Sequence, residues 1–133
     1  MTPSATVRLG TYPTPLEHVE ALSGARTALW VKHDDRVAEL YGGNKVRKLE
    51  HLLGAARAAG LARILTVGAA GSHQVVATAL YGQRHGFEVE AVLVPQPGTS
   101  HARLNLRAAL AHGLRAYPAP AWSAAPFVLA RRW

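Results

Sequence analysis

The sequence predicts an α/β fold in which a parallel sheet is flanked by helices. Short β-prone apolar stretches alternate with amphipathic segments of helical length between about residues 41 and 117, and this is the pattern of βαβ units. The chain has 133 residues, of which 49% are hydrophobic and 17% charged. That length and composition suit one globular domain and exclude a disordered chain.

The first forty residues are expected to form loops, one helical turn and one strand. Two prolines exclude a regular helix over residues 11–16, because each fixes its own φ and biases the preceding residue toward extended geometry. Residues 17–22 are expected to form a helical turn that ends at Gly24. Residues 28–32 are expected to form a short buried strand, since they are apolar, β-prone and bounded by turn residues.

Capping residues and apolar spacing predict three helices in the middle of the chain. The first begins at Asn44, the second at Ser72 and the third at Ser100, and each ends near a glycine. Strands are expected over residues 63–67, 89–94 and 114–117. An apolar helix starting near Ala124 reaches the last residue without a stop signal, so we expect the chain to be truncated.

Composition and charge exclude several classes of protein. No stretch approaches the roughly 20 apolar residues of a membrane span, residues 1–6 do not resemble a signal peptide, and the absence of cysteine excludes disulfides and thiolate chemistry. We therefore expect a cytoplasmic protein with no membrane partner. The net charge of +7 admits nucleic-acid binding, but the basic residues are scattered arginines, and we expect no nucleic-acid partner.

The seven histidines and the paired acids show no metal or catalytic motif. No two histidines have the three- or four-residue spacing that helical metal ligands favour. Adjacent acids such as Asp34 and Asp35 commonly organise or solvate a turn. We expect no metal site.

The first candidate site lies where Gly42, Gly43 and Asn44 lead into a predicted helix. Lys45 falls in the first turn, where the partial positive charge of the helix disfavours a protonated amine and favours a nucleophilic one. The residues themselves leave two interpretations open, which are a reactive amine and an ordinary solvated lysine.

The second candidate site is the loop between a predicted strand and the helix that begins at Ser72. Its small residues expose backbone N–H groups that suit a carboxylate or a phosphate, and parallel sheets bind ligands at this end of their strands. The loop matches neither the P-loop nor the dinucleotide fingerprint. An ordinary tight turn is the alternative interpretation.

Together these residues resemble a known family. The blocks at residues 14–17, 32–35, 42–50 and 71–74 are similar to the N-terminal part of the D-cysteine desulfhydrase and 1-aminocyclopropane-1-carboxylate deaminase family. These are tryptophan synthase β-like, fold type II enzymes that use pyridoxal 5'-phosphate. The resemblance runs from about Leu9 to Tyr117, and the Gly-Gly-Asn-Lys-x-Arg-Lys-Leu-Glu block is its most specific part.

The resemblance implies a role for each candidate residue. Lys45 would hold the cofactor through a Schiff base and then move protons at the substrate α-carbon, and Asn44 would help to position the cofactor ring. Ser72 and Gln74 match the segment that binds the substrate carboxylate, with Ser72 also catalytic. His73 stands where the family has asparagine, and it takes the cofactor and substrate contacts of that position.

The resemblance also implies how the chain is organised and what it does. Residues 1–40 would start the large domain, residues 41–117 would form the βα units of the small domain, and residues 118–133 would be a truncated tail. The family's glycine-rich phosphate cup would lie beyond the chain. We therefore expect a fragment of a lyase or deaminase acting on a small amino acid, with little or no activity by itself.

Two alternatives to an active fragment stay open. The chain could be a non-catalytic basic module that binds an anionic partner through its +7 charge. It could also be an assembly fragment whose sheet edge pairs with a complementing chain or a second copy.

Overall fold

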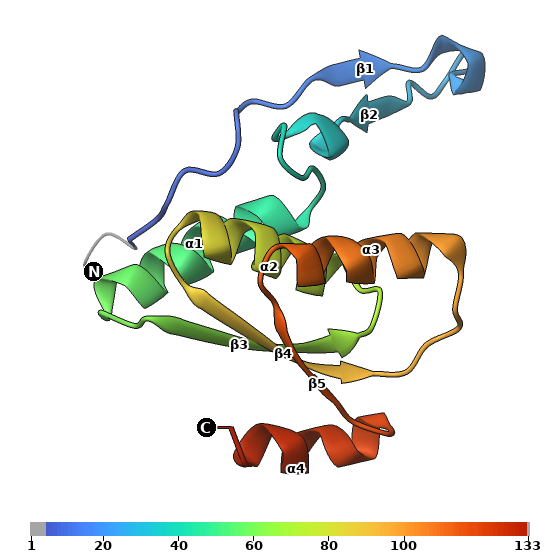
Figure 1. Ribbon diagram of the computed structural model, residues 1–133. Helices are drawn as coiled ribbons and strands as arrows, with labels where there is room; N and C mark the ends of the chain where they lie inside the picture. Colours follow the sequence, from blue (N-terminus) through green and yellow to red (C-terminus); the bar gives the residue numbers. More distant parts are fainter. Residues whose placement is uncertain (1–4, 133) are drawn as a thin grey trace.

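The computed structural model describes residues 5–132. Residues 1–4 and residue 133 lie outside the described part. The expectation of no signal peptide over residues 1–6 and the end of the expected tail therefore fall partly on residues that are not described. The described chain forms a three-stranded parallel sheet and, apart from it, a two-stranded antiparallel hairpin (Figure 1). The strands of the parallel sheet run in the order β3-β4-β5 and comprise Arg63–Ala69, Glu88–Val94 and Arg115–Pro118.

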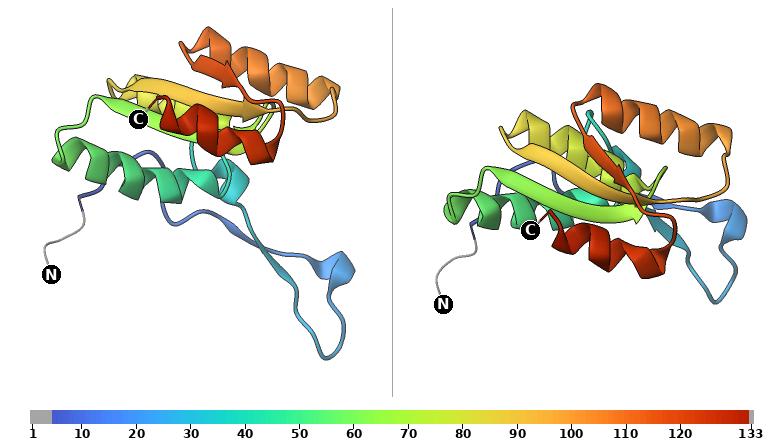
Figure 2. Two further views of the ribbon diagram at one scale, coloured as in Figure 1. Left: turned by 90° about the horizontal axis from the view of Figure 1, so that it is seen from below. Right: turned by 60° about the horizontal axis from the view of Figure 1, so that its bottom comes forward.

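Helices cover both faces of the parallel sheet, which confirms the predicted architecture. Three helices lie on one face, and a short fourth helix lies on the other (Figure 2). In chain order these helices are α1 (Lys45–Ala58), α2 (His73–Arg84), α3 (Ser100–Ala111) and α4 (Ala125–Ala130). None of the helices in the described residues is long and apolar enough to span a membrane.

The central strand shows why this sequence forms a parallel sheet. Six consecutive residues of β4, from Val89 to Val94, are buried, because β4 has a strand on each side and helices against both faces. A strand in that position is apolar on both faces instead of alternating, and β4 follows this pattern except at Glu90, which is 4% exposed. The main core lies between the sheet and the three helices, and it includes Val46, Leu49 and Leu53 of α1.

The capping predictions hold at one helix and fail in detail at the other two. Ser72 caps α2, with its hydroxyl accepting a hydrogen bond from the Gln74 N–H at 3.2 Å. Thr99, one residue before the expected Ser100, caps α3. Asn44 occupies the cap position of α1, but its side chain makes no capping hydrogen bond, so the position was right and the interaction was wrong.

The hairpin corrects the prediction of a buried strand over residues 28–32. Strand β1 (Leu16–His18) pairs with β2 (Trp30–Lys32), and every residue of both strands is exposed. The expected turn over residues 17–22 shrinks to a 3₁₀ helix, Glu20–Leu22, because residues 16–18 join the hairpin. We call residues 16–32 the arm, which projects away from the helices and the parallel sheet (Figure 1).

Candidate active site

The loop before Lys45 is shaped by its two glycines. Gly43 has a φ of +100°, a conformation that side chains rarely tolerate, and a methyl group at Gly42 would overlap the carbonyl of Asp35. The Gly43 N–H donates to the Asp34 carbonyl at 2.7 Å. The Tyr81 hydroxyl of α2 donates to the Tyr41 carbonyl, also at 2.7 Å, so the loop is attached on both sides.

Glu50, the last residue of the most specific sequence block, has a structural role. Its carboxylate accepts hydrogen bonds from the N–H groups of Leu9 and Gly10 at 2.9 and 3.1 Å. It also accepts one from the Tyr12 hydroxyl at 3.0 Å. Burial and the Glu50 carboxylate together raise the pKa of Tyr12 to about 12. Glu50 therefore attaches the N-terminal segment to α1.

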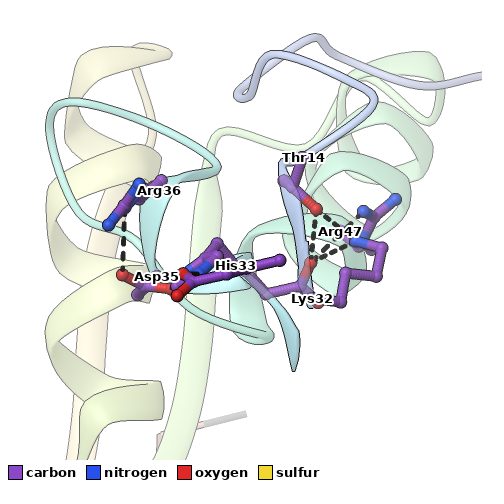
Figure 3. A network of polar contacts seen from close by, with 8 residues as sticks. Thr14, Lys32, His33, Asp35, Arg36 and Arg47 are labelled. Atoms are coloured by element: carbon purple, nitrogen blue, oxygen red, sulfur yellow. Dashed lines mark hydrogen bonds and ion pairs between the residues drawn. The ribbon is translucent and has the colours of Figure 1, made fainter. Parts of the chain in front are cut away.

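Arg47 of the same block helps to attach the base of the arm. Its guanidinium lies 4.3 Å from the centre of the Tyr12 ring and 3.4 Å from the carboxylate of Asp34. Asp34 also accepts hydrogen bonds from the Lys32 ammonium group and, at 3.0 Å, from the Thr14 hydroxyl (Figure 3). The bonds from Lys32 and Thr14 lower the pKa of Asp34. Asp34 thus organises this junction.

Lys45 differs from Arg47 and Glu50 of the same block, whose side chains are held by other residues. It is partly buried at the first position of α1, and it forms no hydrogen bond or ion pair with any residue between 5 and 132. Lys32, by contrast, is paired with Asp34. A primary amine that is not held in an ion pair is available to contact a bound ligand.

The second loop follows β3 and leads into α2. A methyl group at Gly71 would overlap Ala102 of α3, so glycine is required for the close approach of this loop to α3. Ser72 is partly buried and caps α2. The amide nitrogen of Gln74 donates to the Thr78 hydroxyl at 3.0 Å, which turns that nitrogen along the helix.

His73 brings the two candidate sites together. Its Nδ1 is hydrogen-bonded to the hydroxyl of Tyr41, which lies in the loop before Lys45, and its Nε2 lies 3.0 Å from Nε2 of His101 on α3. No sequence motif indicates this cluster, because His73 and His101 are far apart in the chain and have no helical spacing. Among the described residues, no group of three or more histidines and acids is placed to hold a metal ion.

Comparison with known proteins gives the chain a family. The family model described as "Pyridoxal-phosphate dependent enzyme" matches residues 7–121. Nocardicin C-9' epimerase of Nocardia uniformis subsp. tsuyamanensis is 50% identical over 115 residues, which are 86% of this chain and 34% of that protein. A putative 1-aminocyclopropane-1-carboxylate deaminase of Pyrococcus furiosus is 40% identical over 88 residues, 65% of this chain and 27% of that protein.

Further relatives agree with this assignment. D-cysteine desulfhydrase of Salmonella newport is 37% identical over 89 residues, 66% of this chain and 27% of that protein. The crystal structure of an ACC deaminase homologue matches 99% of this chain and 42% of its own, with a TM-score of 0.77 and 27% identity. The chain therefore spans between about a quarter and a third of the length of these curated relatives. It belongs to the family of pyridoxal-phosphate dependent enzymes.

Proposed function

We propose that this chain is the N-terminal portion of a pyridoxal-phosphate dependent lyase or deaminase that acts on a small amino acid. One observation carries the proposal. Lys45 has no ionic partner among the described residues, and Tyr41, in the loop before it, is bonded to His73 of the second candidate site. The loop that leads to this primary amine is thus bonded to the start of a helix that suits a carboxylate.

The residues present fit the reactive end of the cofactor. Lys45 would hold the cofactor through its aldehyde carbon, and Asn44, exposed beside it, would help to position the ring. When bound, pyridoxal phosphate supplies an electron sink for the bonds at the substrate α-carbon. The glycine-rich cup that would bind the cofactor phosphate is not expected among residues 1–133.

The other residues have proposed roles in binding and proton transfer. The free N–H groups at the start of α2, together with Ser72 and Gln74, would bind the substrate carboxylate, since a helix N-terminus favours an anion. Lys45 and Ser72 would each hold or move the proton at the substrate α-carbon. His73 already uses both ring nitrogens, toward Tyr41 and His101, so a cofactor contact at this position requires one of those bonds to open.

The relatives suggest two reactions for the complete site. D-cysteine desulfhydrase and the putative 1-aminocyclopropane-1-carboxylate deaminase favour elimination or ring-opening deamination. The 50% identity with a protein named as an epimerase favours a second candidate, inversion at an amino-acid carbon. Product analysis separates them, because the first reaction releases ammonia and an oxoacid, whereas the second returns an amino acid of opposite configuration.

The organisation of the chain is also part of the proposal. Residues 1–40 would begin the large domain, 41–117 would form the small domain and 118–133 would follow it as a tail. The chain by itself is expected to have weak or no turnover with D-cysteine or aminocyclopropane carboxylate. For full activity it would need a complementing chain or a longer form of the protein. We place this activity in the cytoplasm. Robust release of ammonia by the isolated 133 residues would contradict this part.

Absorbance spectroscopy tests the central role of Lys45. Titration of the chain with pyridoxal phosphate should produce the absorption band of a protein-bound Schiff base, and Lys45→Ala should lose it. Lys48→Ala is the matched control on the same helix and should keep the band. Equal spectra for both variants would refute the proposal. A steep loss of DNA binding with salt in a filter assay would favour the alternative of a basic module that binds an anionic partner.

A further inference from the structure

Four side chains form a continuous set of hydrogen bonds from the loop before Lys45 to helix α3. Tyr41 is bonded to Nδ1 of His73, and Nε2 of His73 lies 3.0 Å from Nε2 of His101. The amide nitrogen of Asn105 lies 3.3 Å from the same His101 nitrogen and 2.9 Å from the carbonyl oxygen of Gly71. These contacts are close enough to determine which atom donates in each bond.

The donors and acceptors can be assigned from the Gly71 carbonyl onward. The carbonyl of Gly71 can only accept, so the group of Asn105 that faces it is the amide NH₂. Asn105 is only 5% exposed, and this bond therefore fixes its orientation. The same NH₂ group faces Nε2 of His101 at 3.3 Å, so Nε2 of His101 is an acceptor and carries no hydrogen. Its single lone pair is shared between Asn105 and His73, which agrees with the longer contact to Asn105. His101 must hold its hydrogen at Nδ1.

The donors and acceptors of His73 and Tyr41 are assigned in the same way. Two ring nitrogens 3.0 Å apart need one hydrogen between them. Because Nε2 of His101 has none, Nε2 of His73 must donate. A neutral imidazole carries one hydrogen, which leaves Nδ1 of His73 as an acceptor. The hydroxyl of Tyr41 is therefore the donor in its bond with His73.

We propose that His101 and Asn105 are positioning residues that hold His73 in its Nε2–H form. His73 in that form accepts from Tyr41, and this bond fastens the loop before Lys45 to the loop that begins α2. The proposal also means that any ligand that needs a hydrogen bond from His73 competes with His101. It rests on the hydrogen bonds of the chain itself, so it does not depend on the proposed reaction.

The tautomers can be measured directly by ¹⁵N NMR on the chain without cofactor. Long-range ¹H–¹⁵N spectra distinguish a ring nitrogen that carries a hydrogen from one that does not. The sample would contain a chelator, so that no bridging metal ion can mimic the contact. A pH of about 8.5, roughly two units above the ordinary imidazole value of 6.5, favours neutral rings. We expect His73 in the Nε2–H form and His101 in the Nδ1–H form.

Two variants of the exposed His101 separate the positioning role from a merely structural one. His101→Gln keeps an acceptor oxygen for His73 and should preserve its Nε2–H signal. His101→Leu removes the acceptor, so His73 should shift to the averaged signals of two exchanging tautomers, and the amide signals of residues 41–45 should move with it. His112→Leu, at the far end of the same helix, should leave His73 unchanged.

Three results would overturn the proposal. One is a wild-type His73 that carries its hydrogen at Nδ1. Another is a wild-type His73 that already exchanges between the two forms. The last is a His101→Gln variant whose His73 signals match those of His101→Leu. Because none of these measurements involves pyridoxal phosphate, a failure here is distinguishable from a failure of the proposed function.

Discussion

The arm and the parallel sheet use similar residues in opposite surroundings. Trp30 and Val31 of β2 are 55% and 41% exposed, whereas Val92 and Val94 of β4 are 0% and 1% exposed. Both strands are short, apolar and β-prone. The difference is that β4 has strands on both sides and helices against both faces, whereas β2 has one partner strand and no helix over it (Figure 1).

The comparison shows that exposure depends on the number of packed neighbours and not on local hydrophobicity. An apolar residue stabilises a fold in proportion to the area it removes from water. The sheet and its helices therefore supply the core, and the arm adds little. The two parts are joined at Asp34, whose carboxylate accepts hydrogen bonds from Thr14 and Lys32 at the base of the arm and from Arg47 of α1 (Figure 3). Glu50 of α1 holds the segment of residues 9–12 that leads into the arm.

The largest effect is expected in the core of the packed part. Leu53→Ala removes a side chain that is 1% exposed and should lower the free energy of unfolding by about 2–5 kcal/mol, because it leaves a cavity. Chemical denaturation measures this loss. The adjacent Leu52, 50% exposed, is the matched control, and its alanine variant should lose less than about 1 kcal/mol. Equal losses would contradict the assigned core.

The next effect is expected at the junction of the two parts. Glu50→Ala leaves two backbone N–H groups and the Tyr12 hydroxyl without their acceptor. It should lower the free energy of unfolding by about 1.5–3 kcal/mol, the range for hydrogen bonds to a charged group. Glu50→Gln keeps one acceptor oxygen and should lose less. If both variants denature like the wild type, Glu50 does not attach the N-terminal segment.

A smaller, pH-dependent effect is expected at Tyr12. Its pKa of about 12 in the folded chain lies above the ordinary value of 10.0, so the folded state holds the phenol proton more tightly. The resulting stabilisation is complete below pH 10 and is lost as the pH rises from 10 to 12. Burial also raises the pKa of Tyr41 and Tyr81, so ultraviolet titration should show several tyrosines ionising above pH 10, and Tyr12→Phe should remove the component near 12. Ionisation of every tyrosine near pH 10 would contradict the contact with Glu50.

The smallest effect is expected in the arm itself. Trp30→Ala changes a residue that is more than half exposed, and it should alter the free energy of unfolding by no more than about 0.5 kcal/mol. The large aromatic area makes this a severe test, because a packed tryptophan would cost several times more. A loss comparable with that of Leu53→Ala would mean that the arm is buried in solution.

The parallel sheet, its helices and the two loops were predictable because they depend on local signals. Apolar periodicity locates the elements, and Ser72 caps its helix as its position predicts. The exposure of the arm was not predictable, since the apolar residues 28–32 indicate β structure but not what packs against it. The bond between His73 and His101 depends on tertiary placement of residues far apart in the chain. Likewise, Thr99 and Ser100 are both good caps, and only the structure distinguishes them.

The most specific sequence block contains two kinds of residue that sequence cannot separate. Arg47 and Glu50 hold the fold together through contacts with the N-terminal segment and the arm. Lys45 has no such contact among the described residues. The structure therefore separates Arg47 and Glu50, whose side chains hold the fold together, from Lys45 and Lys48, which make no hydrogen bond or ion pair among the described residues.

Borohydride reduction of the chain with pyridoxal phosphate, followed by peptide mapping, tests the proposed role of Lys45 most directly. The chain has three lysines, Lys32, Lys45 and Lys48. Lys48 is exposed and Lys45 partly buried, so accessibility by itself would favour Lys48. Our account predicts that most of the reduced cofactor is found on Lys45. Label mainly on Lys48, or spread over the three lysines, would contradict it.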